Sequence, residues 1–210
     1  RGPRLMFMSV PQAQSRELGP RGQLAILGEH RDHRDHDLYR REPALPRHVE
    51  EARGAVGDVF TITGLHPGAP GAHLALYQEL HFGEGPLSRR ERELVATVVS
   101  RANGCEYCLA HHADAFGRHA SEPGLQALVA TDYTRADLSP RERAIADHAV
   151  KLTRSPHDVG EKDVEKLRAV GLTEREVLDV TLSISYFNFV NRVASGLGLK
   201  PQDVRGKYRY

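Results

Sequence analysis

The sequence predicts an all-α protein, and three observations support that prediction. Apolar residues recur at helical spacing in several segments, whereas no long segment alternates as a half-buried strand does. The helix-capping pattern Ser/Thr-x-x-Glu occurs at residues 88–91, 139–142 and 173–176. Gly and Pro cluster between the periodic segments, where they end one helix and precede the next. We therefore expect a compact domain built from several helices.

The chain of 210 residues is long enough for one domain with a sizeable core and an extension, or for two small domains. Residues 1–41 contain many Pro and Gly and little apolar periodicity, so a poorly ordered N-terminal extension is expected there. The all-α domain is expected over residues 42–210. His30, His33 and His36 alternate with Arg and Asp, and a solvated charged segment is favoured over a metal site.

Each helix is predicted from its apolar periodicity and its end signals. Pro140 stands at the first position of one helix, where its missing N–H costs nothing, and Gly171 closes another. The repeated capping pattern is consistent with a duplicated helical unit. It is equally consistent with helices that acquired the same capping residues independently. In chain order the expected helices cover residues 48–63, 72–81, 88–102, 104–118, 139–153, 161–170 and 173–197.

The segment 173–197 is apolar on more than one face. Helices of this kind are normally buried, and one small domain covers only part of such a surface. The segment is therefore expected to pack against the other helices and against a partner subunit. This composition predicts a homo-oligomer.

Composition excludes several classes of partner. A net charge of +1 and a pI near 8.0 give no argument for nucleic-acid binding. No apolar run reaches the ~18–20 residues of a membrane span, and no signal-peptide pattern is visible. Two closely spaced cysteines do not form a disulfide scaffold and point to redox or metal chemistry in a reducing compartment. A cytoplasmic protein is therefore expected.

Both cysteines, Cys105 and Cys108, fall in the first turn of the helix expected after Asn103-Gly104. His112 lies one turn beyond Cys108, so the three side chains share one helical face. The positive end of the helix dipole and a nearby imidazole favour a thiolate there. The pattern predicts a redox-active thiol pair, in which we expect Cys108 to have the lower pKa.

Zinc binding is the main alternative from the residues themselves. The available ligands are Cys105, Cys108, His111 or His112, and His119. All of them lie on one short segment, without a second ligand pair far along the chain, which is unusual for a structural zinc site. A zinc-stabilised interaction domain is the less favoured reading.

Five motifs in order resemble the alkylhydroperoxidase D family, within the carboxymuconolactone decarboxylase superfamily, and its subgroup of peroxidase-related enzymes. The spacing Glu-x(11)-Cys-x(2)-Cys-x(3)-His is similar to the active-site signature of that family. The matching stretches are Leu87-Ser-x-x-Glu-Arg-Glu, Asn103-Gly-Cys-x-Tyr-Cys-x-x-x-His, Tyr133-Thr-Arg-Ala-Asp-Leu-Ser-Pro-Arg-Glu-Arg, Val170-Gly-Leu and Phe187-Asn-Phe-Val-Asn-Arg-Val-Ala.

The resemblance implies a thiol peroxidase without a cofactor. Cys108 would attack an organic hydroperoxide or hydrogen peroxide, and Cys105 would resolve the product to a disulfide. His112 would act as the acid and base, with Glu93 accepting its hydrogen bond. A separate dithiol protein or small thiol would reduce the disulfide. Family members assemble as dimers, trimers or hexamers.

Other residues test or limit this reading. From the residues alone Glu93 would be a solvated helix residue, and Glu91 and Glu106 are expected to be exposed. Tyr107 precedes the second cysteine where some family members carry a histidine, which would shorten the relay. His111 is expected to bond a backbone carbonyl.

A dithiol–disulfide oxidoreductase or redox sensor without efficient peroxide turnover is the second functional reading. Lactone decarboxylation, known in the superfamily, needs no cysteine pair and is disfavoured. Asn188 and Asn191, inside the apolar C-terminal segment, are expected to bond neighbouring backbone and to stay outside the site.

Overall fold

The structure is a computed structural model and describes residues 57–201. These residues belong to one compact unit, His33–Tyr210. The expected extension over residues 1–41, the boundary at residue 42, the histidines at 30–36 and the first part of the helix expected over 48–63 lie outside the described residues.

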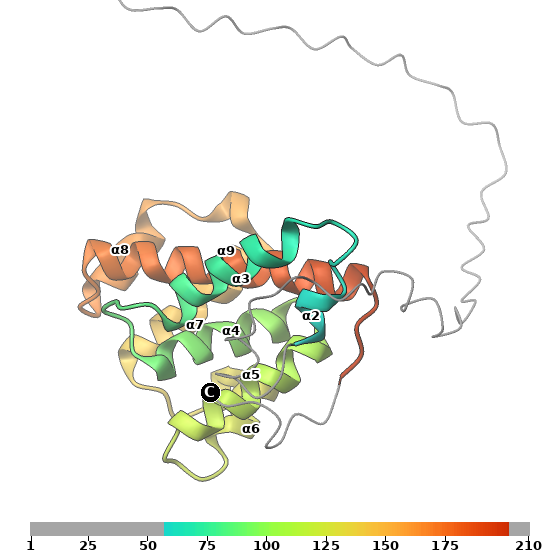
Figure 1. The fold of residues 1–210 in the computed structure, drawn as a ribbon. Helices are drawn as coiled ribbons and strands as arrows, with labels where there is room; N and C mark the ends of the chain where they lie inside the picture. Colours follow the sequence, from blue (N-terminus) through green and yellow to red (C-terminus); the bar gives the residue numbers. More distant parts are fainter. Residues whose placement is uncertain (1–56, 202–210) are drawn as a thin grey trace, which may run out of the picture. The chain divides into compact units, whose positions relative to one another are not determined.

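The all-α prediction is confirmed: residues 57–201 contain eight α-helices and no strand (Figure 1). None of these helices is long and apolar enough to cross a membrane. Two short 3-10 helices, η2 (Tyr133–Arg135) and η3 (Pro156–Asp158), follow α6 and α7. The α-helices are α2 (Asp58–Thr61), α3 (Ala69–Phe82), α4 (Arg89–Ala102), α5 (Glu106–His119), α6 (Leu125–Asp132), α7 (Pro140–Arg154), α8 (Glu161–Ala169) and α9 (Glu174–Gly196).

Helix α4 forms the centre of this arrangement. It lies against α5, α6, α7 and α9 (Figure 1). Its apolar side chains Leu94, Val95, Val98 and Val99 are buried. Because α4 packs on four helices, it is buried on most of its circumference, and a polar residue within it is held in a fixed environment.

The turn between α4 and α5 determines where the first cysteine lies. Gly104 has φ 65°, a left-handed conformation that suits Gly. The N–H of Cys105 donates to Ser100 O at 3.0 Å, and the N–H of Gly104 donates to Arg101 O at 3.1 Å. This pair of bonds is a Schellman motif, which satisfies the last carbonyls of α4. It makes Cys105 the N-cap residue of α5.

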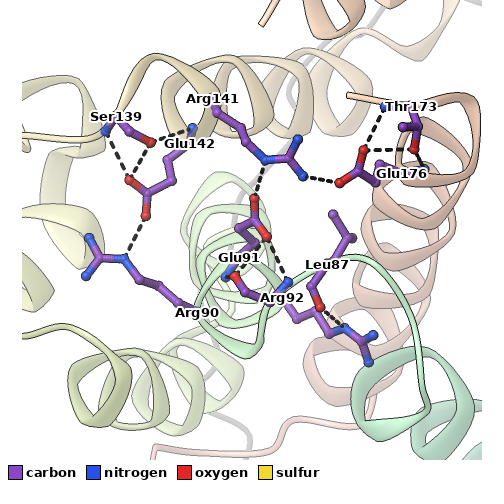
Figure 2. A network of polar contacts seen from close by, with 10 residues as sticks. Leu87, Arg90, Glu91, Arg92, Ser139, Arg141, Glu142, Thr173 and Glu176 are labelled. Carbon is purple, nitrogen blue, oxygen red and sulfur yellow. Dashed lines mark hydrogen bonds and ion pairs between the residues drawn. The ribbon is translucent and has the colours of Figure 1, made fainter. Parts of the chain in front are cut away.

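The three predicted capping boxes are present at the starts of α4, α7 and α9 (Figure 2). In each box one carboxylate oxygen of the glutamate accepts hydrogen bonds from the capping Ser or Thr. The other oxygen accepts a hydrogen bond from an arginine side chain. Arg141 bridges Glu91 and Glu176, with 2.6 Å to each, and Arg90 donates to Glu142 at 2.7 Å. This arginine–carboxylate network ties three helix starts together. It also explains why Glu91, expected to be exposed, is buried; Glu106 is exposed as expected.

Three other expectations about the elements were wrong. Helix α3 begins at Ala69 rather than residue 72, because Pro70 is accepted in the first turn of a helix. Helix α6 was not predicted at all, since it has only eight residues and no side-chain cap at its start. The helix expected over 48–63 does not run through residue 57, because Gly57 is extended, and α2 begins at Asp58. Helices α4, α5, α7, α8 and α9 begin and end within two residues of the expected limits.

Helix α9 is apolar on two faces, as predicted. One face is buried through residues such as Val180, Ile184 and Phe187. On another face Leu178 is 52% exposed and Phe189 is 51% exposed. The second face is therefore an exposed apolar surface within the described part of the chain.

Candidate active site

The two cysteines are free, buried thiols at the start of α5. Cys105 is the N-cap residue, and Cys108 lies in the first turn. Cys105 is 3% exposed and Cys108 is 2% exposed. The expected placement of the pair at a helix N-terminus is therefore found in the structure.

The order of the two thiol pKa values differs from the sequence expectation. A hydrogen bond from Cys108 lowers the pKa of Cys105 to about 6, against burial. The pKa of Cys108 is raised, because its S–H is engaged with Cys105 and because the thiol is buried. The pair therefore holds one proton near neutral pH, and Cys108 needs a base before it can react.

His112 and Glu93 form a direct contact between α5 and α4. The Nδ1–H of His112 donates to Glu93 Oε2 at 2.8 Å. This bond fixes the imidazole and leaves Nε2 free for proton exchange. Glu93 is fully buried, so the reading of a solvated surface residue does not apply. The catalytic roles of both residues remain predictions.

The second oxygen of Glu93 faces two further groups. Arg89 Nη2 lies 2.6 Å from Glu93 Oε1, and His81 Nε2 lies 3.1 Å from the same atom. Burial alone would raise the pKa of Glu93, but the facing His81 and His112 hold it well below its usual range. Burial lowers the pKa of His81 to about 4, so this imidazole is neutral at pH 7. Glu93 is thus an ionised carboxylate with three neighbouring donors.

A cavity of about 40 Å³ gives access to Cys108. Cys108 and His112 both line it, whereas Cys105 does not. Aromatic and aliphatic side chains form most of the remaining wall, which favours an apolar substrate group. The lining residues are Gly57, Val59, Phe60, Tyr77, Tyr107, Cys108, His111, His112, Tyr186, Phe187 and Val190.

Tyr107 and His111 line the same cavity in supporting positions. The Tyr107 hydroxyl accepts a hydrogen bond from the N–H of Val59 at 3.3 Å, which ties the start of α2 to α5. His111 Nδ1 lies 2.9 Å from Tyr107 O, the backbone contact expected for it. Both residues shape the cavity rather than extend the His112–Glu93 contact.

Sequence reasoning missed several residues of the site. His81 was not singled out, because it reaches Glu93 only through the packing of α3. Asn191 was expected to stay outside, yet a hydrogen bond from it favours the ionised form of Cys108 and so opposes the raised pKa of this thiol. Ser195, also on α9, similarly helps to lower the pKa of Cys105. The polar positions of α9 inside its apolar pattern were the available signal.

The predicted zinc ligands do not gather in the structure. Within residues 57–201, the potential ligand atoms that come within 4.8 Å of one another belong to His81, Glu93 and His112. Neither cysteine belongs to this group. The guanidinium of Arg89 beside Glu93 opposes a second cation there.

An all-α fold with a Cys-x-x-Cys pair at a helix start, next to a buried Glu–His contact, defines a class of helical proteins with a dithiol site. Residues 67–123 match the carboxymuconolactone decarboxylase family. A peroxidase-related protein from Silicibacter sp. TM1040 is 33% identical and has a TM-score of 0.70, covering 77% of this chain and 88% of that one.

A second solved structure gives the same result. The alkylhydroperoxidase AhpD core protein from Ralstonia eutropha JMP134, also called peroxidase-related, is 30% identical with a TM-score of 0.71; the match covers 80% of this chain and 97% of that one. The curated protein YdfG of Bacillus subtilis (strain 168) is 25% identical over 61% of this chain and 87% of its own length. The chain belongs to the alkylhydroperoxidase D family, within the carboxymuconolactone decarboxylase superfamily.

Proposed function

We propose that the protein is a thiol peroxidase in which Cys108 reduces a hydroperoxide. One observation carries the proposal: Cys108 and His112 line the same cavity, and the Nδ1 of His112 is hydrogen-bonded to the buried carboxylate of Glu93. Two relatives, each described as an uncharacterized peroxidase-related protein, are consistent with this activity.

The first step is attack on the distal peroxide oxygen. His112 Nε2 takes the Cys108 proton, and the resulting thiolate forms an S–O bond while the O–O bond breaks. The leaving alkoxide takes the proton back from His112 and departs as an alcohol. Cys108 becomes a sulfenic acid, and the peroxide is reduced by two electrons.

The second step closes the disulfide. The Cys105 thiolate attacks the Cys108 sulfenic acid, and hydroxide leaves and becomes water with a proton from solvent. A separate dithiol protein or small thiol then supplies two electrons to reopen the bond. The lowered pKa of Cys105 suits this resolving role, because a thiolate is the attacking form.

The cavity size and lining support a preference among peroxides. A volume of about 40 Å³ admits a hydroperoxide group and a small organic substituent at most without movement of the walls. The aromatic walls favour an apolar substituent over water. Small organic hydroperoxides are therefore the proposed substrates, with hydrogen peroxide as a poorer one.

Peroxide consumption under a dithiol reductant tests the proposal. Wild-type protein should consume a small alkyl hydroperoxide continuously, and Cys108→Ser should abolish the consumption. Wild-type protein that consumes no peroxide above the reductant alone would exclude a peroxidase function.

The order of the thiol pKa values favours one alternative. A low pKa at the first cysteine of a Cys-x-x-Cys pair is typical of dithiol–disulfide exchange. In a dithiol oxidoreductase or redox sensor Cys105 would be the first nucleophile. Exchange with an added disulfide, without peroxide turnover, would favour this second function.

The exposed face of α9 supports assembly with further copies of the chain. Leu178, Leu182 and Phe189 are 40–52% exposed and lie on one side of the helix. A homo-oligomer that buries this face is the proposed state, as the family resemblance implies. A cytoplasmic location stays a prediction.

A further inference from the structure

A second cavity, of about 270 Å³, lies next to the loop between α3 and α4. It shares no lining residue with the cavity that contains Cys108. Arg89, Arg92 and His81 contribute its polar nitrogen atoms, and Glu84 contributes a carboxylate. His81 is neutral at pH 7, so the two arginines against one carboxylate give the lining a net positive charge.

Arg92 is the most unusual of these residues, because it is a charged side chain only 7% exposed. Its Nη1 donates to Gly83 O at 2.8 Å. Its Nε donates to Leu87 O at 3.2 Å (Figure 2). These acceptors are neutral carbonyls, and Arg92 forms no ion pair within residues 57–201. Burial and the like charge of Arg89 lower the pKa of Arg92. Asp179, Glu79 and Glu91 act on Arg92 at longer range and only partly offset this effect. Buried charges in proteins are normally paired directly, so the guanidinium can accept a further, closer anionic partner.

His81 adds an independent sign of an absent ligand. The residue is 1% exposed, and its Nδ1 has no hydrogen-bond partner within the described residues. Arg89 is only partly neutralised, because one Nη donates to a backbone carbonyl, His81 O, and the other to Glu93. The side chains beside this cavity that can donate to an anion are therefore the two arginines of α4, Arg89 and Arg92, whereas the free Nδ1 of neutral His81 can accept a hydrogen bond from a protonated ligand or water.

The loop backbone is built to approach Arg92 closely. A Cβ at Gly85 would lie 2.9 Å from Arg92 Nη2, and a Cβ at Gly83 would lie 2.4 Å from Glu79 O. Larger residues at either position would displace Arg92 or the end of α3. The absence of a side chain at Gly85 leaves room for the guanidinium at the cavity wall, and the carbonyl of Gly83 accepts its hydrogen bond.

We infer that this second cavity is a binding site for a small oxyanion, such as phosphate, sulfate or a carboxylate, held by Arg92 and Arg89. Arginine is well suited to such anions because its planar fork donates two parallel hydrogen bonds. Glu84 is exposed on the loop and can turn toward solvent when an anion enters. The site does not depend on the peroxidase proposal.

An anion at Arg89 would also act on the thiol site. Arg89 Nη2 contacts Glu93 Oε1, and Glu93 holds His112. An anion that draws the guanidinium away would remove one of the donors that hold the Glu93 carboxylate in place beside His112. The two cavities are therefore connected through Arg89 and Glu93.

Calorimetric titration with inorganic phosphate tests the site, at constant ionic strength balanced with sodium chloride. The wild-type protein should bind phosphate saturably. Arg92→Met and Arg89→Met should each weaken binding at least about tenfold, because a hydrogen bond to a charged group is lost. Arg101→Met, which removes an exposed charge from the same helix, should leave affinity within about twofold.

A second variant covers the case in which Arg92→Met fails to fold. Glu84→Gln removes the carboxylate of the lining from an exposed loop position and should tighten phosphate binding about two- to fivefold. No saturable binding by wild-type protein, equal binding by Arg89→Met, or unchanged binding by Glu84→Gln would overturn the inference. Sulfate and acetate titrations then distinguish tetrahedral from planar oxyanions.

Discussion

Burial and geometry give the two cysteines different tasks. Cys108 lines the cavity but has a raised pKa, whereas Cys105 lies outside the cavity and ionises near pH 6. A thiol that is accessible but protonated needs a general base, which makes His112 and Glu93 more important. The lower pKa of Cys105 serves the resolving step instead.

Removal of the base should lower peroxide reduction without unfolding the protein. We expect His112→Ala to lower the rate of Cys108 oxidation by roughly 100-fold or more, because general acid–base catalysis contributes about 10²–10⁴. Glu93→Gln should lower it less, since the amide still accepts a hydrogen bond but carries no charge. Stopped-flow measurement of thiol loss with circular dichroism as the folding check measures both. A wild-type rate in Glu93→Gln would remove Glu93 from the mechanism.

The Cys105 thiolate should depend on a donor at position 108. As pH rises through about 6, wild-type protein should gain one thiolate absorbance in the ultraviolet. Cys108→Ser keeps a hydroxyl donor and should keep the step near that pH. Cys108→Ala removes the donor and should move the step up toward the ordinary thiol pKa of about 8.5.

Cys105→Ser is the matched control for that titration. Only Cys108 remains in this variant, and its pKa is raised, so the step near pH 6 should vanish. A step that persists near pH 6 in Cys105→Ser would reverse the assignment of the thiolate.

At the level of the elements, the α4–α5 turn links fold and site. Gly104 ends α4 in a left-handed conformation and places Cys105 at the start of α5. No atom lies within 4 Å of a Cβ built at Gly104, so a substitution there is affected by backbone conformation alone. The cost of a side chain at this position is therefore predictable.

Gly104→Ala should lower the free energy of unfolding by about 1–2 kcal/mol, the cost of a left-handed L-residue. Gly196→Ala is the matched control, because Gly196 is helical and also has no atom within 4 Å of its Cβ position. That change should be neutral or stabilise by at most about 0.5–1 kcal/mol, because Gly196 is the last residue of α9. Urea unfolding of both variants measures the difference, and a neutral Gly104→Ala would contradict the Schellman assignment.

Local sequence signals predicted most helices, because a capping box or a glycine at a helix end involves only residues that are close together in the chain. They placed α4, α5, α7 and α9 closely, and the thiol pair with them. Helix α6 was not predicted because it has no capping side chain and follows Gly124, whose φ is 79°. Short helices of this kind are held by packing rather than by their own sequence.

Tertiary contacts explain what the sequence did not predict at the site. The short distance between Glu93 and His112 results from the packing of α4 on α5. From the sequence, this contact was expected only because the motif spacing resembles that of a known family. His81 and Arg92 could not be found from local patterns, because their surroundings come from the α3–α4 loop. The buried Glu91 was missed because Arg141, its partner, is fifty residues away.

At the scale of the whole molecule, the exposed face of α9 predicts self-association. Leu182→Glu should lower the molar mass measured by light scattering at micromolar concentration, because a charge cannot be buried in an apolar interface without a partner. Thr131→Glu on α6, far from α9 in Figure 1, is the control and should keep the wild-type mass. A monomeric wild-type protein would contradict the assembly.

The central claim is that Cys108 is the sulfur that reacts with peroxide. The most direct measurement treats Cys105→Ser with one equivalent of a small alkyl hydroperoxide, traps sulfenic acid with a dimedone-type reagent and locates the adduct by mass spectrometry. The adduct should form on Cys108, because only this thiol lines the cavity with His112. The same treatment of Cys108→Ser should leave Cys105 unmodified. An adduct on Cys105 in Cys108→Ser, with none on Cys108 in Cys105→Ser, would contradict the account.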